Sequence, residues 1–303
     1  MILNELSPYV RNLVIHTSHG LTPAYIDPEH VFTYLKSGHG FFIMADMQYA
    51  VQPGDLIIIP PYLLHIINCC KNEPLMQYVI HFDLQFDPDR QGSLPLEEGM
   101  NYARYCELHG NFFADFPAVV SVPVPERRRV EEIFRRMNDE SKFQTPYREL
   151  TLKSGMLELL NIFFRCSELN LTAPRRAGCK TWPNLERALQ YIQSHYHEPL
   201  DLAEVSREAG LSLNYLCRVF KDYTRTSIHQ YINTVRLVEA KRRIAADESG
   251  FKEIAAECGF SSVHLFSRIF KAISGQTPSE YRDNIRSTEL KSKPVRTNKK
   301  LLP

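Results

Sequence analysis

Two short segments in the C-terminal third of the chain carry arginine and lysine at matching positions. Arg218-Val219-Phe220-Lys221 corresponds to Arg268-Ile269-Phe270-Lys271 at an offset of 50 residues. The arginine guanidinium offers a bidentate fork that fits guanine in the major groove, and lysine pairs with phosphate. A single helical arginine could equally contact a phosphate or a surface carboxylate. The recurrence of the pair favours a role in reading DNA.

The repeat extends upstream into the elements that must position these side chains. Leu202–Ser212 is similar to Phe251–Ser261 at an offset of 49 residues. Each copy is typical of a helix that ends at a glycine, Gly210 or Gly259, followed by a short turn and a second helix that a serine opens. We therefore predict two helix-turn-helix units, with Ser212 and Ser261 or Ser262 as the capping residues.

The second helix of each unit is predicted to bury one face and to present the other to DNA. Apolar residues at spacings of three and four define the buried face. Between the units, Ile228 to about Ala246 forms an amphipathic helix of roughly 27 Å at 1.5 Å per residue, which suits recognition helices in adjacent major grooves. The candidate DNA contacts are Asn214, Cys217, Arg218, Lys221, Val263, His264, Ser267, Arg268 and Lys271.

With these motifs the segment from Leu185 to Arg286 resembles the DNA-binding domain of the AraC/XylS family of bacterial transcription regulators. The resemblance implies about seven helices that grip one face of double-stranded DNA through both recognition helices. At Arg225 the chain departs from the family, which often has glycine there. The residues that carry the resemblance are Ala209–Ser212, Tyr215–Lys221, Arg236-Leu237, Ala240, Ile254-Ala255, Cys258–Ser262, Phe266–Lys271 and Thr277–Arg282.

Charge and composition agree with a soluble two-domain protein. The chain has 303 residues, of which 44% are apolar and 23% charged, and from Lys180 onward 20 Lys and Arg face 14 Asp and Glu. A basic C-terminal part suits a polyanion, although solvated basic faces are common. No apolar run of membrane length and no secretory signal is present, which predicts a cytoplasmic protein without a membrane partner. The seven cysteines are scattered and read as buried free thiols rather than a disulfide framework or a zinc site.

The N-terminal part predicts a β domain followed by a helical pair, so the fold class is α+β. Short strands between Val31 and about Phe86 indicate an antiparallel β-barrel or jelly roll. From Pro125 to Glu168 the period becomes helical, with Leu150, Met156, Leu157, Leu160 and Phe164 on one face. We place a sensor domain at 1–169, a linker at 170–183, the DNA-binding domain at 184–286 and a basic, disordered tail at 287–303.

The β domain also resembles the cupin-like sensor barrel found in many family members. Residues Gly38 to Gln52, Pro53–Pro61, Leu64-His65 and Val79–Phe82 carry this weaker resemblance. The paired histidines of metal-binding cupins are missing, so we predict no metal and no cofactor. The residues expected to line an effector cavity are His16, Tyr34, His65, Gln77 and His81, each of which could instead be an ordinary core or rim residue.

We therefore predict a transcription regulator that is not an enzyme and that responds to a small molecule. The family resemblance implies a sugar-like effector, a homodimer formed through the helical pair, and recruitment of RNA polymerase. Packing of that pair against the barrel explains its apolar face equally well. Two alternatives stay open: a metal-dependent sugar enzyme of the cupin type with a DNA-binding appendage, and a regulator without a small-molecule effector.

Overall fold

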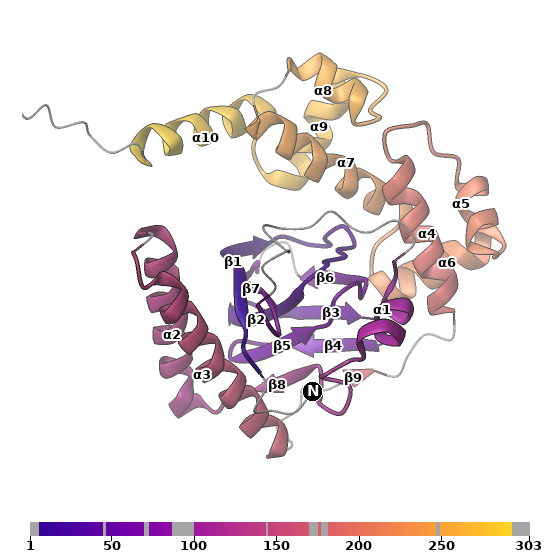
Figure 1. Ribbon diagram of the computed structural model, residues 1–303. Coiled ribbons are helices and arrows are strands. Elements are labelled where there is room, and N and C mark those ends of the chain that lie inside the picture. The colour runs from indigo at the N-terminus through magenta and orange to yellow at the C-terminus, as the bar shows by residue number, and fades with distance from the viewer. Residues whose placement is uncertain are drawn as a thin grey trace, which may run out of the picture. The chain divides into compact units, whose positions relative to one another are not determined.

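The computed structural model describes residues 6–44, 47–69, 73–86, 100–143, 145–169, 175–176, 181–246 and 249–292 (Figure 1). The chain divides into two compact units. One comprises Met1–Arg187 with Arg218–Thr226, and the other Ala188–Cys217 with Ser227–Pro303. The first is rich in antiparallel strands and the second is helical, which confirms the predicted α+β class.

Two antiparallel sheets form the first unit. The larger has the strand order β1-β7-β2-β5-β8, and the smaller has the order β6-β3-β4-β9. Sequence patterning found the central strands but missed β1, β6, β8, β9 and the short helix α1. The strands are β1 (Tyr9–Ser18), β2 (His30–Ser37), β3 (Gly40–Met44), β4 (Met47–Val51), β5 (Asp55–Ile59), β6 (His65–Cys69), β7 (Leu75–Asp83), β8 (Val119–Ser121) and β9 (Arg175–Arg176); α1 is Tyr102–His109.

The central strands of the larger sheet are buried on both faces. On β2, Val31 belongs to the apolar cluster between the sheets, whereas Phe32 and Tyr34 belong to the cluster beneath the helices. On β5, Ile57 and Ile59 belong to the first cluster, and Leu56 and Ile58 belong to the second. Burial on both faces explains why β5 is a continuous apolar run rather than an alternating one.

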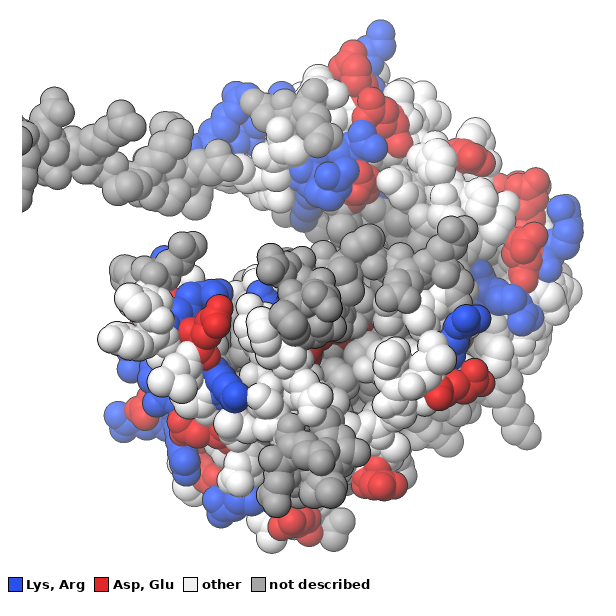
Figure 2. All heavy atoms as spheres, in the orientation of Figure 1, with Lys and Arg blue, Asp and Glu red and all other residues white. Residues whose placement is uncertain are grey.

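The predicted helical pair covers one face of the larger sheet. Helices α2 (Val124–Phe143) and α3 (Arg148–Glu168) approach closely at Gly155, where an added Cβ would lie 2.5 Å from the sulfur of Met137. The predicted apolar face was partly wrong, because Leu150 and Leu157 are exposed and Leu152, Leu159 and Phe163 are buried instead. Basic and acidic side chains, blue and red in Figure 2, lie next to one another on this pair, where they form ion pairs.

Seven helices, α4 to α10, follow within the part of the chain that the structure describes, as predicted. Helix α4 begins at Trp182, inside the predicted linker, whose residues 175–176 form β9 beside β4. Helix α10 continues to Ser292, six residues into the predicted tail, because no glycine or proline interrupts it before Pro294; residues 293–303 lie outside the described part. These helices are α4 (Trp182–His195), α5 (Leu202–Ala209), α6 (Leu213–Thr224), α7 (Ile228–Ala245), α8 (Phe251–Glu257), α9 (Val263–Ser274) and α10 (Pro278–Ser292).

The described cysteines are free thiols. Cys69, Cys166 and Cys258 are buried, whereas Cys106 and Cys217 are half-buried; Cys70 and Cys179 lie outside the described residues. Burial raises the pKa of the Cys258 thiol to about 11, which makes it a poor nucleophile near neutral pH. Among the described helices, none combines the length and apolar character needed to cross a membrane.

Candidate nucleic-acid interface and ligand cavity

The first helix-turn-helix unit consists of α5 and α6. The Asp201 carboxylate caps α5 by accepting a hydrogen bond from the amide of Ala203 at 2.9 Å. Gly210 ends the helix in the left-handed conformation, at φ 67° and ψ 33°. The amide of Leu211 then donates to the carbonyl of Ser206 at 3.0 Å, which satisfies a free carbonyl of the last turn. The predicted glycine terminus is therefore confirmed.

The second unit, α8 and α9, repeats this construction. Gly259 has a φ of 78°, and the amide of Phe260 donates to the carbonyl of Ala255 at 2.9 Å. The hydroxyl of Ser262 caps α9 by accepting from the amide of Leu265 at 3.2 Å. Ser262, not Ser261, is thus the capping residue, whereas Ser212 in the first unit accepts through its backbone carbonyl from Leu216.

Both second helices bury one face and expose the predicted DNA-contacting face. In the core lie Leu216 and Phe220 of α6, and their counterparts Phe266 and Phe270 of α9. Within the described part of the chain, the Arg268 side chain forms no ion pair or hydrogen bond, so its guanidinium is available to a partner. The exposed candidates are Asn214, Arg218, Lys221, His264, Arg268 and Lys271, and the half-buried ones are Cys217, Val263 and Ser267.

The two units differ at the residue that ends the recognition helix. Gly275 ends α9 at φ 78°, whereas the corresponding residue after α6 is Arg225, which adopts φ 60°. A residue with a Cβ pays about 1–2 kcal/mol for this left-handed conformation, which glycine adopts freely. The departure seen in the sequence is therefore a point of backbone strain in the first unit.

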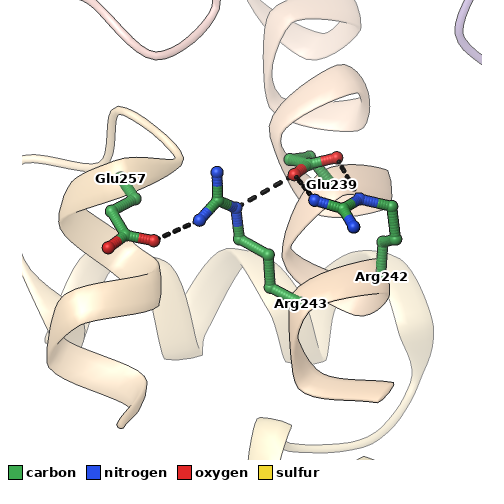
Figure 3. Close-up of polar contacts among 4 residues, drawn as sticks. All are labelled: Glu239, Arg242, Arg243 and Glu257. Atoms are coloured by element: carbon green, nitrogen blue, oxygen red, sulfur yellow. Dashed lines mark hydrogen bonds and ion pairs between the residues drawn. The ribbon is translucent and has the colours of Figure 1, made fainter. Parts of the chain in front are cut away.

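Arginines on α7 tie this helix to the neighbouring elements. The Arg236 guanidinium donates to the carbonyls of Tyr196 at 2.8 Å and Glu198 at 2.9 Å, in the connection that precedes α5. Two turns further on, Arg243 bridges Glu239 of its own helix and Glu257 of α8 (Figure 3). Hydrogen bonds from Arg242 and Arg243 lower the pKa of the Glu239 carboxyl, so Glu239 stays charged.

Gly259 brings the turn of the second unit against the same connection. A Cβ at this position would lie 2.4 Å from the carbonyl oxygen of Tyr196, 3.0 Å from the carbonyl carbon of His197 and 3.1 Å from the Arg236 guanidinium carbon. Such distances leave no room for a side chain. The glycine is therefore required twice, by its left-handed backbone and by this contact.

A cavity of about 220 Å³ lies in the β domain. Its apolar walls include Val31, Phe42 and Ile59, which belong to the cluster between the two sheets. Four of the five predicted cavity residues line it: His16, His65, Gln77 and His81. A small cavity with apolar walls and a few polar groups is typical of a binding site for a small molecule.

Tyr34 lies elsewhere, so that part of the predicted cavity was wrong. Its neighbour on β2, Thr33, lines the cavity, and alternation along the strand turns Tyr34 to the opposite face. There the Tyr34 hydroxyl donates to the Glu131 carboxylate of α2 at 3.3 Å, and burial raises the pKa of the phenol. The sequence prediction also missed Tyr25 and Asp27, which come from the irregular loop before β2, where no periodicity marks them.

No group of three or more potential metal ligands comes together within the described residues. The closest approach to one is Asp27 with two histidines: His65 Nε2 lies 3.8 Å and His81 Nδ1 3.7 Å from its carboxylate oxygens. Both nitrogen–oxygen distances are longer than a normal hydrogen bond. The three residues therefore form a polar corner of the cavity.

Comparison with known proteins gives two family matches. Residues 205–284 match the model of a helix-turn-helix domain, and residues 14–146 match that of an AraC-like ligand binding domain. The HTH-type transcriptional regulator YisR of Bacillus subtilis is 25% identical over 255 residues, which is 82% of this chain and 84% of its own length. An HTH-type transcriptional regulator of Staphylococcus aureus is 35% identical over 98 residues, 32% of this chain and only 13% of its own length.

Solved structures give further similarities. An AraC-type transcriptional regulator from Chromobacterium violaceum is 29% identical, covers 34% of this chain and 92% of its own, and has a TM-score of 0.33. ToxT from Vibrio cholerae is 14% identical, covers 90% of this chain and 98% of its own, and has a TM-score of 0.44.

Replacing Arg225 by glycine should stabilise the fold. The change removes the left-handed strain at φ 60°, and part of the gain is offset by the greater freedom of glycine in the unfolded chain, so we expect a net gain of about 0.5–1 kcal/mol. Urea unfolding followed by the fluorescence of the single tryptophan, Trp182, measures it, because that ring lies 5.4 Å from Tyr223 beside the strained residue. Arg225→Ala is the control, since it keeps the strain; an equal gain there would contradict the explanation.

Gly259→Ala should destabilise the helical unit more than Gly275→Ala does. Both glycines have a φ of 78°, but an added Cβ at Gly275 meets no described atom within 4 Å, whereas at Gly259 it meets the Tyr196 carbonyl. We expect a loss of about 1–2 kcal/mol at Gly275 from strain alone, and about 1–3 kcal/mol more at Gly259. Urea unfolding followed by far-ultraviolet circular dichroism compares the two, and equal losses would show that the close contact is unimportant.

Proposed function

Because the chain belongs to the AraC/XylS family, as a DNA-binding transcription regulator with an AraC-like ligand-binding domain, we propose that a small molecule in the N-terminal cavity controls how it engages promoter DNA. The observation that carries this proposal is the cavity itself, which holds a polar corner against apolar walls inside the matched ligand-binding segment. A regulator of this kind acts in the cytoplasm, where bacterial DNA lies.

The nine exposed and half-buried candidates on α6 and α9 are proposed as the DNA contacts. Helix α9 is capped by Ser262 and ends at Gly275, and the arginines and lysines occupy equivalent exposed positions in α6 and α9. The two helices would enter adjacent major grooves on one face of the double helix. Arg218 and Arg268 would read bases, and Lys221 and Lys271 would pair with phosphates.

The effector is proposed to be a small metabolite of sugar-like size. A cavity of about 220 Å³ is smaller than the sites that bind drug-sized ligands, and four of its lining residues are histidine or glutamine. For the ligand to regulate transcription, it must bind two states of the protein with unequal affinity. The bound state would then change promoter engagement and the recruitment of RNA polymerase.

We further propose that α3 forms a homodimer interface. Leu150 is 68% exposed and Leu157 is 39% exposed, and they lie two helical turns apart on one side of α3. These apolar side chains are the ones that packing against the barrel leaves uncovered. An isologous interface would bury them against the same residues of a second copy and give four helix-turn-helix units per assembly.

The decisive experiment maps the genomic sites bound by the full chain, and then measures transcription and DNA affinity with and without metabolites linked to the flanking genes. We expect one metabolite to change the affinity for the mapped sites or the transcript level. A ligand that binds without changing DNA affinity, site spacing or transcription would overturn the effector part of the proposal.

Arg268→Ala should relax sequence preference at a single base position. If the guanidinium reads guanine, its loss costs about 1–3 kcal/mol at the preferred base and leaves other positions unchanged. Binding selection from a randomised DNA pool, with the wild type and Lys271→Ala measured in parallel, tests this. A uniform loss over all sequences, with a weaker salt dependence, would assign Arg268 to a phosphate instead.

Leu150→Glu combined with Leu157→Glu should convert the dimer into a monomer, because four carboxylates would meet at the isologous interface. Light scattering coupled to size-exclusion chromatography gives the mass. Leu108→Glu is the matched control, since this leucine of α1 is 60% exposed and lies outside the proposed face. An unchanged mass in the double variant would place the interface elsewhere.

A further inference from the structure

The polar corner of the cavity presents hydrogen-bond acceptors, and its side chains lie too far apart for a hydrogen bond to one another. His65 Nδ1 lies 3.1 Å from the carbonyl oxygen of Leu63, and because a carbonyl only accepts, this nitrogen carries the proton. Burial lowers the pKa of the His65 imidazole more than Asp27 raises it, so the ring is neutral. Nε2 is then a bare acceptor, and it faces the Asp27 carboxylate oxygen at 3.8 Å, too far for a hydrogen bond.

Gln77, on strand β7 of the larger sheet, adds a third acceptor. Its side chain is fully buried and lines the cavity, and its amide nitrogen donates to the hydroxyl of Ser18 at 3.0 Å. Its amide oxygen is buried without a hydrogen-bond partner among the described residues. A buried acceptor without a donor destabilises the empty cavity, and a ligand donor would remove that cost.

The charge of the residues that line the cavity also favours a ligand with hydrogen-bond donors over an anion. Asp27 is the one carboxylate among the described lining residues, and none of these is Lys or Arg. Burial, with a smaller contribution from His19, lowers the pKa of the His16 imidazole, so this ring adds no positive charge near neutral pH. An anionic ligand would meet a carboxylate here and find no permanent cation to pair with.

We propose that the cavity selects a small ligand that carries no anionic group and directs hydrogen-bond donors, either an ammonium or paired hydroxyls, to Asp27, His65 and Gln77. Its carbon skeleton packs against the apolar wall that includes Val31 and Phe42. The inference rests on the proposed effector function and narrows it: sugar acids and sugar phosphates are excluded as effectors, whereas neutral sugars, amino sugars and small amines fit.

The test uses the full chain and matched probes that share one skeleton. A hexose set contains glucose, glucosamine, glucuronate and glucose 6-phosphate; a four-carbon set contains butane-1,4-diol, putrescine and succinate. Binding is measured by titration calorimetry and by ligand-observed nuclear magnetic resonance. We expect binding only in the hydroxyl and ammonium forms. Binding confined to the acid or phosphate forms, equal binding of all forms, or no binding by any probe would overturn the proposal.

Two variants locate the binding. Asp27→Asn should weaken the ammonium probes by at least about tenfold and the hydroxyl probes by less, because a hydrogen bond to a charged group is the stronger one. Gln77→Met removes the buried acceptor at similar volume and should weaken both. Asp115→Asn, a carboxylate outside the cavity lining, is the control. Unchanged affinity in Asp27→Asn and Gln77→Met would overturn the proposal.

DNA affinity of the same samples distinguishes failure of the proposed ligand class from failure of the proposed effector function. If a donor-bearing probe binds through Asp27 but leaves promoter affinity and transcription unchanged, the ligand class stands and the effector function fails. If an anionic metabolite changes promoter affinity, the effector function stands and the ligand class fails.

Discussion

The contact between Gly259 and the carbonyl of Tyr196 is the constraint on which the helical unit depends. It joins the turn of the second helix-turn-helix unit to the connection that precedes α5 of the first, although 63 residues separate them in sequence. Arg236 closes the contact by donating to two carbonyls of that connection, and Arg243 holds α8 through Glu257. Charge-assisted hydrogen bonds to the backbone resist displacement more strongly than neutral ones. Helix α7 therefore separates the two units and also holds the connection before α5 and helix α8 in place through its arginines.

In the β domain, burial on both faces of one sheet links the cavity to the helical pair. Thr33 of β2 lines the cavity, and the next residue, Tyr34, reaches Glu131 of α2. Because the side chains of a strand alternate, a shift of β2 at Thr33 would also move Tyr34, which contacts α2. The Tyr34–Glu131 hydrogen bond therefore connects the strand that lines the cavity to the helical pair. Lys36 of β2 pairs with the same Glu131 and strengthens the connection.

The two helix-turn-helix units share a sequence pattern but differ in backbone strain at the end of the second helix. The second ends its recognition helix at Gly275 without strain, whereas the first ends at Arg225 in the same left-handed region. The free-energy cost of this left-handed conformation therefore falls on the first unit. The side chain of Arg225 also places an exposed positive charge at the end of that unit's second helix.

The sequence alone determined the repeat, because glycine and serine at helix boundaries and apolar residues at spacings of three and four act locally. Gly210, Gly259 and the buried Phe220 and Phe270 were predictable for that reason, whereas the choice of Ser262 over Ser261 as the cap was not. Tertiary structure decided what depends on contacts between distant segments. Asp27 comes from an unpatterned loop, Tyr34 turns away from the cavity because register sets its side, and Leu157 is exposed because α3 packs through Leu159 and Phe163. Local propensity does not predict any of these three features. Each depends on which face of a strand, helix or loop packs against a segment far away in the sequence.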